Sequence, residues 1–363
     1  MRFLILDTYY LAFLHSFYAR HPDLSHRPYA EQWRILMDQC FGTADFYSAN
    51  LKKLGHDAHE VVANCETLQR QWARENALHL WAAYPICRCL RRVKAWQLAV
   101  LQAQVEQLRP DVLYVQDMNW TDATLLKSVK AKTRLVVGQT AYALRCGLDL
   151  QPYDVVITSF PHYVDSFRSQ GLHSQYLRFA FDERVLDRLD VHNPTYNVTF
   201  VGGFSPQHSQ GTAIFEQLAQ EIPVKFWGYG VENLPKNSLV RRYHCGQAWG
   251  IEMFRILSES RVTLNRHIDV AQSYANNMRL FDATGVGTCL VTDLKDNLHE
   301  LFEPDREVVA YTCAEDCVEK VRYLLEHENE RAAIAKSGQR RTLREHTYDQ
   351  RMQEFVGIVR KYL

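Results

Sequence analysis

The residues best suited to bind an anion gather in two segments of the second half of the chain. Arg266 and His267 follow residues 261–265, for which we predict a strand that ends in polar and basic groups. Further on, a short helix is predicted whose first N–H groups, around Asn277 and Met278, are free to bind a phosphate. In an open α/β sheet, ligands bind where strand ends and helix starts meet. We therefore predict a phosphate site formed by these two segments.

The charged side chains of this region have more than one chemical role open to them. Arg266 and Arg279 are candidate phosphate ligands, because a guanidinium group binds phosphate through two parallel hydrogen bonds. Arg279 has an alternative partner in Asp282, which lies three residues further along the same predicted helix. His267 and Asn265 either donate to a phosphate or pack inside the protein.

Glycine turns and aromatic residues follow two other predicted strands of this half. Gly202, Gly203 and Phe204 end the strand at 196–201 and lead into a helix, an arrangement that lets the backbone approach an anion. The Gly-x-Gly-x-x-Gly fingerprint is absent, so no dinucleotide site is predicted, and a tight turn without a ligand is the alternative. Trp227 and Tyr229 end the next strand, where they either stack on a nucleobase or belong to the core.

Polar side chains also follow the predicted strands of the first half, which end in Asp7, Thr8, Tyr9, Gln116, Asp117, Asn119, Gln139 and Ser159. The carboxyl ends of parallel strands meet at one edge of a sheet, so these side chains are expected to converge. The candidates for catalysis among them are Asp117, Asn119, Tyr9 and Gln139. Asp117 either orients or deprotonates a substrate hydroxyl, or serves as an acidic residue at a helix N-terminus.

The elements that must position these residues alternate between strands and helices along the whole chain. This alternation predicts an α/β protein with mostly parallel sheets and right-handed crossovers, built as two Rossmann-like doubly wound domains that face each other across a cleft. We place the domains at residues 1–190 and 191–347, and residues 348–363 form a terminal helix that crosses back to the first domain. The aromatic segment 11–28 is predicted to be an irregular loop, and the helical region 65–108 is predicted to break at Pro85.

Composition narrows the class of protein. The chain has 363 residues, with 42 Lys and Arg against 42 Asp and Glu, so no overall field would draw it to nucleic acid. No apolar run is long enough to span a bilayer, although a peripheral membrane contact stays open. The nine cysteines include no Cys-x-x-Cys pair, so no metal site is predicted and a reducing, cytoplasmic location is expected.

The motifs of the second half resemble those of the CgeB-like glycosyltransferases, whose catalytic core has the GT-B fold. The segments that carry the resemblance, which together cover about residues 196–350, are 201–203, 227–230, 264–267, 276–287, 307–311 and 345–348. The first half is similar more weakly, through 111–117 and 159–163.

The resemblance implies transfer of a sugar from a nucleotide-diphosphate sugar to an acceptor hydroxyl, with retention of anomeric configuration and with neither metal nor cofactor. The second half would hold the donor and the first half the acceptor, which is a glycan, a lipid-linked molecule or a protein in surface glycan synthesis. The residues assigned to the donor site are Gly202, Gly203, Phe204, Trp227, Tyr229, Asn265, Arg266, His267, Asn276, Asn277, Met278, Arg279 and Asp282.

One departure from the family pattern leaves other functions open. Asp282 stands where the family has a glutamate that accepts hydrogen bonds from the ribose, whereas Tyr274 stands at the position of a second, sugar-binding glutamate. Because this second acid is missing, a nucleotide-sugar epimerase or hydrolase of the same fold and a non-catalytic sugar-nucleotide-binding protein are the alternatives.

Overall fold

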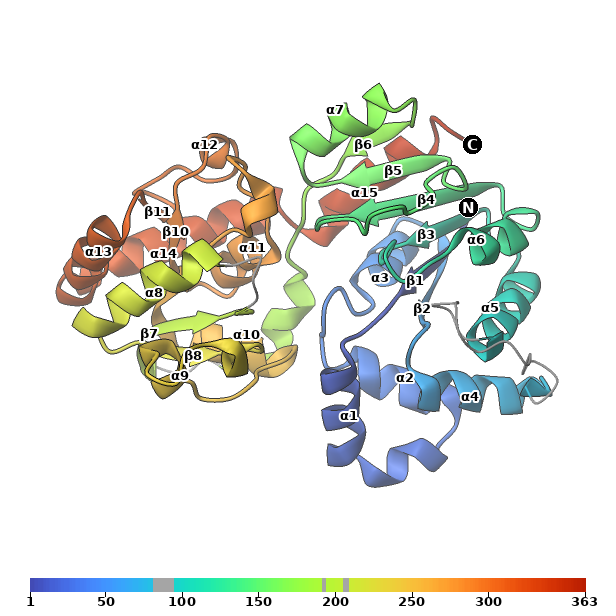
Figure 1. The fold of residues 1–363 in the computed structure, drawn as a ribbon, viewed down its shortest axis with the longest axis horizontal. Coiled ribbons are helices and arrows are strands. Elements are labelled where there is room, and N and C mark those ends of the chain that lie inside the picture. Colours follow the sequence, from blue (N-terminus) through green and yellow to red (C-terminus); the bar gives the residue numbers. More distant parts are fainter. Residues whose placement is uncertain (81–94, 191–193, 205–208) are drawn as a thin grey trace. The chain divides into compact units, whose positions relative to one another are not determined.

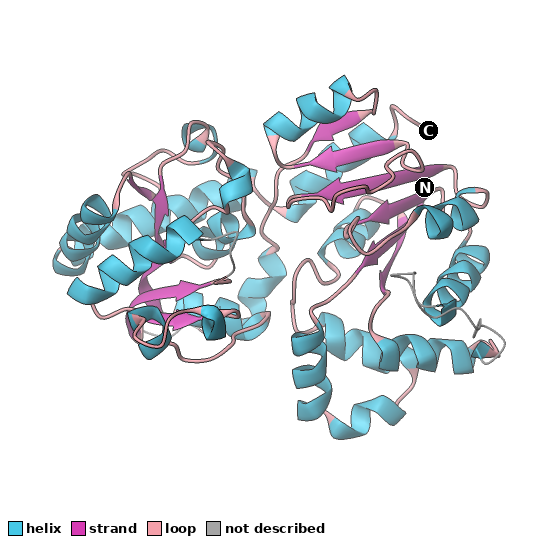
Figure 2. Ribbon diagram, in the orientation of Figure 1, coloured by secondary structure: helices cyan, strands magenta, loops and turns pink. Residues whose placement is uncertain are grey.

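The computed structural model describes residues 1–80, 95–190, 194–204 and 209–363, which form two compact units (Figure 1). Unit 1 comprises Met1–Leu177 with Met352–Leu363, and unit 2 comprises Arg178–Arg351. The helix break predicted at Pro85 lies outside the described residues. Each unit is a parallel β-sheet with helices on both faces (Figure 2), which confirms the predicted α/β fold.

The sheet of unit 1 has the strand order β2-β1-β3-β4-β5-β6, and every pairing is parallel. Its strands are β1 (Arg2–Asp7), β2 (Asp57–Val62), β3 (Val112–Val115), β4 (Leu135–Thr140), β5 (Val155–Thr158) and β6 (Ser174–Tyr176). Leu6 pairs with Val115, so Asp7 and Gln116 leave the sheet side by side. The strand order reverses between β1 and β3, and in such sheets ligands bind at the carboxyl ends of these two strands.

The helices of unit 1 include one that sequence patterning did not predict. Residues 11–28 do not form an irregular loop, because α1 covers Leu11–Arg20 and a 3₁₀ helix covers Pro22–His26. Phe13, Leu14 and Phe17 share one buried face of α1, and Phe13 stacks on Phe41 with ring centroids 4.0 Å apart. The other helices described here are α2 (Tyr29–Met37), α3 (Phe46–Lys53), α4 (Glu66–Glu75), α5 (Ala95–Leu108), α6 (Ala123–Lys130) and α7 (Pro161–Ser169).

The sheet of unit 2 has the order β11-β10-β9-β7-β8, again with parallel pairings. Its strands are β7 (Tyr196–Val201), β8 (Lys225–Trp227), β9 (Ser260–Asn265), β10 (Cys289–Asp293) and β11 (Val309–Tyr311). The order reverses between β7 and β9. Asn265 pairs with Thr292, so the segments after β9 and β10 leave the sheet together, and with them the residues of the predicted phosphate site.

Helices flank this second sheet and connect its strands. They are α8 (Ser209–Glu221), α9 (Leu239–Arg242), α10 (Ile251–Ser258), α11 (Met278–Gly285), α12 (Leu298–Leu301), α13 (Ala314–Glu326) and α14 (Glu328–Glu345). The last helix, α15 (Tyr348–Val359), starts in unit 2 and ends in unit 1, where Phe355 packs against Phe3 and Tyr114. None of the helices in the described part of the chain is long and apolar enough to cross a membrane.

Candidate functional site

Two asparagines fix the start of α11 against the end of β9. Asn277 is the N-cap of α11, and its Oδ1 accepts a hydrogen bond from the Leu280 N–H at 3.1 Å. Its Nδ2 donates to Asn265 Oδ1 (2.9 Å) and to the Arg266 carbonyl (3.3 Å), and Asn265 in turn donates to Thr292 Oγ1 at 2.9 Å. Because the amides of Asn265 and Asn277 are occupied by these bonds, both residues position the site.

His267 is buried and held by Asp293, a residue that was not among the predicted site residues. The His267 Nδ1 lies 2.7 Å from Asp293 Oδ1, and the backbone N–H of His267 donates to the same oxygen at 3.1 Å. Burial alone would raise the pKa of Asp293, but His267 and Lys295 outweigh burial and lower this pKa to about 2. A carboxylate only accepts hydrogen bonds, so Nδ1 carries the hydrogen. The other ring nitrogen, Nε2, is buried and has no hydrogen-bond partner among the described residues.

Asn276 and Arg266 carry hydrogen-bond donors on the segment between β9 and α11. Asn276 is 7% exposed, and its Nδ2 has no hydrogen-bond partner within the described part of the chain. The Arg266 side chain runs past the first turn of α8, where a Cβ added to Gly211 would lie 2.5 Å from Arg266 Cδ. Glycine at position 211 thus leaves room for the arginine. The N-terminus of α8 and the guanidinium group both favour an anion.

Arg279 and Asp282 form a buried pair, which was the alternative that their spacing allowed. Arg279 Nη1 lies 3.0 Å from Asp282 Oδ2, and Arg279 Nε donates to the Val201 carbonyl at 3.1 Å. Burial raises the pKa of Asp282 to about 7, against the opposing charge of Arg279. These contacts tie α11 to the end of β7 rather than presenting either charge to a ligand. Met278, the first residue of α11, is half-buried.

The glycine turns after β7 and β8 pack against each other. The Gly202 N–H donates to the Trp227 carbonyl at 3.0 Å, and the Phe204 N–H donates to the Tyr229 carbonyl at 2.8 Å. Gly228 has a φ of +146°, and a Cβ there would overlap the carbonyl oxygen of Gly202. Close packing of two loops therefore explains these glycines without a ligand. Phe204 itself is buried in the core.

The aromatic residues of this edge have separate roles. Trp227 is buried and packs edge-on against Tyr196, with ring centroids 5.1 Å apart, so its placement is that of a core residue. Tyr229 is half-buried and stacks on Trp249 with centroids 5.8 Å apart and ring planes at 14°. A Cβ at Gly203 would meet the Tyr229 ring. The Tyr229–Trp249 pair offers a flat face for a nucleobase, and Trp249 was not among the predicted site residues.

At the carboxyl edge of unit 1, Asp117 is held by three hydrogen bonds. It accepts from Thr8 Oγ1 at 2.5 Å, from the Tyr142 hydroxyl at 3.0 Å and from the Trp120 N–H at 3.1 Å. A carboxylate with this many donors is an anchor for the loops that follow β1, β3 and β4. Asn119 joins the same loops, because it donates to the Ala143 carbonyl and accepts from the Arg145 N–H.

The other two predicted catalytic residues are placed mainly by packing. Tyr9 is 3% exposed, its hydroxyl faces Met37 Sδ at 3.8 Å, and its ring packs against Phe41. It therefore belongs to the core beneath α1. Gln139 is half-buried, and its Oε1 accepts hydrogen bonds from the Tyr47 and Tyr114 hydroxyls.

Asp7 is the carboxyl group of this edge with the chemistry of an acid or base near neutral pH. Its Oδ1 accepts the Thr8 N–H at 2.7 Å, and its side chain is half-buried. Burial raises the pKa of Asp7 to about 7, partly opposed by the Thr8 hydrogen bond and reinforced by the charge of Asp117. Asp7 appeared in the sequence only as one polar strand end among several, because burial and the neighbouring acid are properties of the fold.

A cavity of about 580 Å³ opens beside this edge, between the start of α1, the end of β2 and the loop after β3. Its walls include His15 and Tyr18 of α1, Trp96 of α5 and Trp120. Asn64, another lining residue, accepts the Tyr9 N–H and donates to the Tyr9 carbonyl, which connects the cavity to the end of β1. Aromatic walls with a few polar groups are typical of small-molecule sites.

Comparisons with known proteins agree with this architecture. Residues 210–357 match the model of a family described as glycosyl transferase-like. None of the curated proteins compared with the chain matches it.

Three similar solved structures span the chain. Sucrose-phosphate synthase from Thermosynechococcus elongatus is 11% identical, with 99% of each chain covered and a TM-score of 0.58. HepE of Anabaena in complex with UDP-glucose is 14% identical, with 99% of this chain and 100% of that chain covered and a TM-score of 0.58. A glycosyltransferase from Rickettsia africae is 10% identical, with 99% and 98% covered and a TM-score of 0.61. At these identities the likeness shows the fold, which is GT-B as predicted.

Proposed function

We propose that the protein is a glycosyltransferase that binds a nucleotide-diphosphate sugar on unit 2 and an acceptor hydroxyl on unit 1. The observation that carries the proposal is the group of hydrogen-bonding side chains at the carboxyl edge of unit 2. His267 Nε2 and Asn276 Nδ2 are buried hydrogen-bonding atoms without partners among the described residues, and Arg266 lies beside the first turn of α8. A departing nucleoside diphosphate gains negative charge, which Asn276, Arg266 and a doubly protonated His267, donating from Nε2 beside Asp293, would stabilise.

We further propose that the reaction needs no metal ion, because Arg266, His267 and the N-terminus of α8 are placed to balance the diphosphate charge. The resemblance of the α11 segment to the CgeB-like family supports retention of anomeric configuration. In that case the departing phosphate takes the acceptor proton, and Asp7 orients the acceptor hydroxyl. The nucleobase would stack on the Tyr229–Trp249 pair.

The acceptor side of the proposal rests on the cavity of about 580 Å³ in unit 1. Its aromatic walls suit the apolar faces of sugar rings, which supports a glycan, free or linked to a lipid or protein. A role in surface glycan synthesis and a cytoplasmic location stay proposals that depend on the family resemblance.

The proposal is tested by measuring nucleotide release from UDP-sugars, with UDP-glucose as the first donor because HepE was solved with it. We expect UDP release that requires an acceptor glycan and that persists in EDTA. Conversion of the donor sugar without acceptor would indicate the epimerase, release of free sugar the hydrolase, and binding without turnover the non-catalytic protein. His267→Ala should abolish release, whereas His299→Ala, an exposed residue of α12, should not change it.

A further inference from the structure

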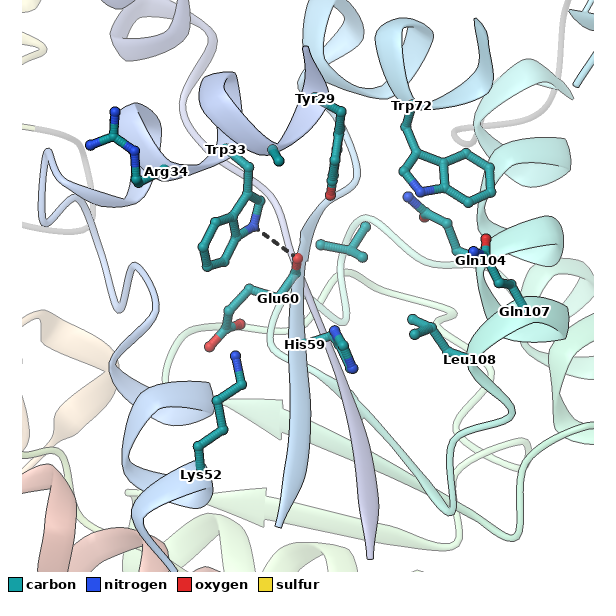
Figure 3. Close-up of a pocket in the computed structure, with 12 residues that line it drawn as sticks. Tyr29, Trp33, Arg34, Lys52, His59, Glu60, Trp72, Gln104, Gln107 and Leu108 are labelled. Atoms are coloured by element: carbon teal, nitrogen blue, oxygen red, sulfur yellow. Dashed lines mark hydrogen bonds between the residues drawn. The ribbon is translucent and has the colours of Figure 1, made fainter. Parts of the chain in front are cut away.

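A second cavity, of about 460 Å³, lies on the outer side of the edge strand β2 (Figure 3). It is formed by residues of β2 and of the helices α2, α3, α4 and α5. Its volume falls within the range of known small-molecule sites, about 300–1,000 Å³. Its lining includes none of the residues at the carboxyl ends of β1 and β3. It also shares no lining residue with the aromatic cavity beside that edge.

The cavity extends toward the amino ends of the strands, away from the candidate active site. Gln107 and Leu108, which line it, are the last residues of α5. The Leu108 carbonyl accepts a hydrogen bond from Arg2 at 2.6 Å, and Arg2 is the first residue of β1. Glu60, on the opposite wall, lies in the middle of β2. A ligand here would therefore occupy a site distinct from the carboxyl edge of this sheet.

Three aromatic side chains supply flat apolar faces. Figure 3 shows Trp33 on one side, Trp72 on the other and the Tyr29 hydroxyl pointing between them. Trp33 is fixed by a hydrogen bond from its Nε1 to the Glu60 carbonyl at 3.1 Å, and the Tyr29 backbone N–H donates to Glu75 at 2.7 Å. All three rings are half-buried, so each keeps a face that a ligand can contact.

The polar groups of the cavity include a buried acceptor that lacks a donor. Gln104 is 2% exposed, and its Nε2 donates to Gln69 Oε1 at 2.9 Å. Its own Oε1 has no hydrogen-bond partner in the described part of the chain. Leaving a buried acceptor unpaired costs about 1–3 kcal/mol, which a ligand hydroxyl would recover. Glu60 is 5% exposed and accepts the Ser48 N–H at 2.9 Å.

The charges around the cavity favour a neutral ligand. The acidic Glu60 lines the wall, while the basic Lys52 and Arg34 are exposed at the mouth, so the lining does not present charge of a single sign to a ligand. Burial raises the pKa of Glu60 well above its usual range, because a buried carboxylate loses its hydration. Donors, acceptors and aromatic faces together match a sugar ring, which has hydroxyls at its rim and C–H groups on its faces.

We propose that this cavity is a second saccharide-binding site, which holds a neutral mono- or disaccharide unit between Trp33, Trp72 and Gln104. Binding of the sugar at this site does not depend on the transfer reaction. The origin of the sugar does rest on the proposed function. If the protein is a glycosyltransferase, the bound sugar is a unit of the acceptor glycan that lies away from the reacting hydroxyl.

The test measures binding of maltose, lactose and N-acetylglucosamine to the full chain by saturation-transfer NMR, with titration by tryptophan fluorescence. We expect at least one of these sugars to bind. Trp72→Ala and Gln104→Leu should each weaken binding at least tenfold, and Lys52→Met, an exposed change that leaves the core intact, should also weaken it. UDP affinity should stay unchanged in all three variants. Tyr243→Ala, at an exposed aromatic residue after α9 that lines neither cavity, is the control and should leave affinity for these sugars unchanged.

Three outcomes would overturn the proposal. In the first, none of the neutral sugars binds to the folded wild-type protein. In the second, sugar binding persists in Trp72→Ala but is lost in Trp120→Ala, which would place it in the cavity beside the active edge. In the third, choline or inorganic phosphate binds in a Gln104-dependent manner while the sugars do not, which would assign a charged ligand. A protein that binds sugar here but transfers none would refute the proposed function alone.

Discussion

Replacing Asp293 with asparagine tests whether the buried imidazole of His267 serves the donor. Asp293 is 8% exposed and does not itself offer a free edge to a ligand, because His267 and Lys295 both hold its carboxylate. The substitution keeps the size of the side chain and removes its charge, so we expect His267 to lose the orientation that leaves Nε2 available.

The magnitude follows from the pKa of Asp293. A lowering from 3.8 to about 2 corresponds to about 2.5 kcal/mol of net stabilisation of the carboxylate. His267 and Lys295 share this amount, so the contact with His267 contributes about 1–2 kcal/mol to the native state. If the same amount holds the imidazole in its binding orientation, its loss corresponds to roughly 5- to 30-fold in donor affinity.

Isothermal titration calorimetry with UDP at pH 7 measures this change directly. Lys295→Met is the matched control, because Lys295 contacts the other carboxylate oxygen, at 3.3 Å, and donates to the Gln272 carbonyl rather than to His267. It should weaken UDP binding less than Asp293→Asn. An Asp293→Asn protein that is folded and binds UDP with the wild-type dissociation constant would refute the role given to His267.

Other predictions concern acceptor activation, packing and acid stability. Because the pKa of Asp7 is about 7, kcat/KM should rise with pH to a plateau above pH 7. Asp7→Asn should lower kcat/KM about ten- to hundredfold and abolish its rise with pH. UDP affinity should not change in this variant. Gly228→Ala, which would clash with Gly202, should lower the melting temperature sharply, whereas Gly357→Ala, at an exposed helical position with open space, should raise it slightly. Burial lowers the pKa of His346 to about 4. The stability that the neutral imidazole contributes is therefore present above pH 6.5 and lost as the pH falls toward 4. In urea unfolding, the free energy of unfolding of wild type should fall by about 3 kcal/mol more than that of His346→Gln over this window. An equal loss in the two proteins would contradict the assigned burial.

Strands such as β1, β3 and β7 were predictable because each contains a short apolar run followed by a polar or glycine residue. β7 has the predicted bounds, and β9 starts one residue before the predicted strand at 261–265. The helix α1 was not predicted, since its aromatic and histidine residues masked the spacing of Phe13, Leu14 and Phe17. The helical spacing of these three residues becomes evident only when the packing of Phe13 on Phe41 is known.

The roles of individual site residues depended on long-range contacts that a single sequence does not reveal. Arg266 and His267 directly follow β9, as the strand predicted at 261–265 implied. The partner of His267, Asp293, is 26 positions away and is brought there by the pairing of β9 with β10. Arg279 could pair with Asp282 or with a phosphate, and only the buried geometry selects the first.

The central claim, that the carboxyl edge of unit 2 binds a nucleotide-diphosphate sugar without a metal, is tested most directly by calorimetric titration of UDP and UDP-glucose in EDTA. Wild type and a His267→Ala, Asn276→Ala double variant are compared, with circular dichroism to show that both are folded. The account predicts saturable binding to wild type and at least a hundredfold loss in the variant. Absence of binding to wild type for both ligands, or the same dissociation constant in the two proteins, would contradict it.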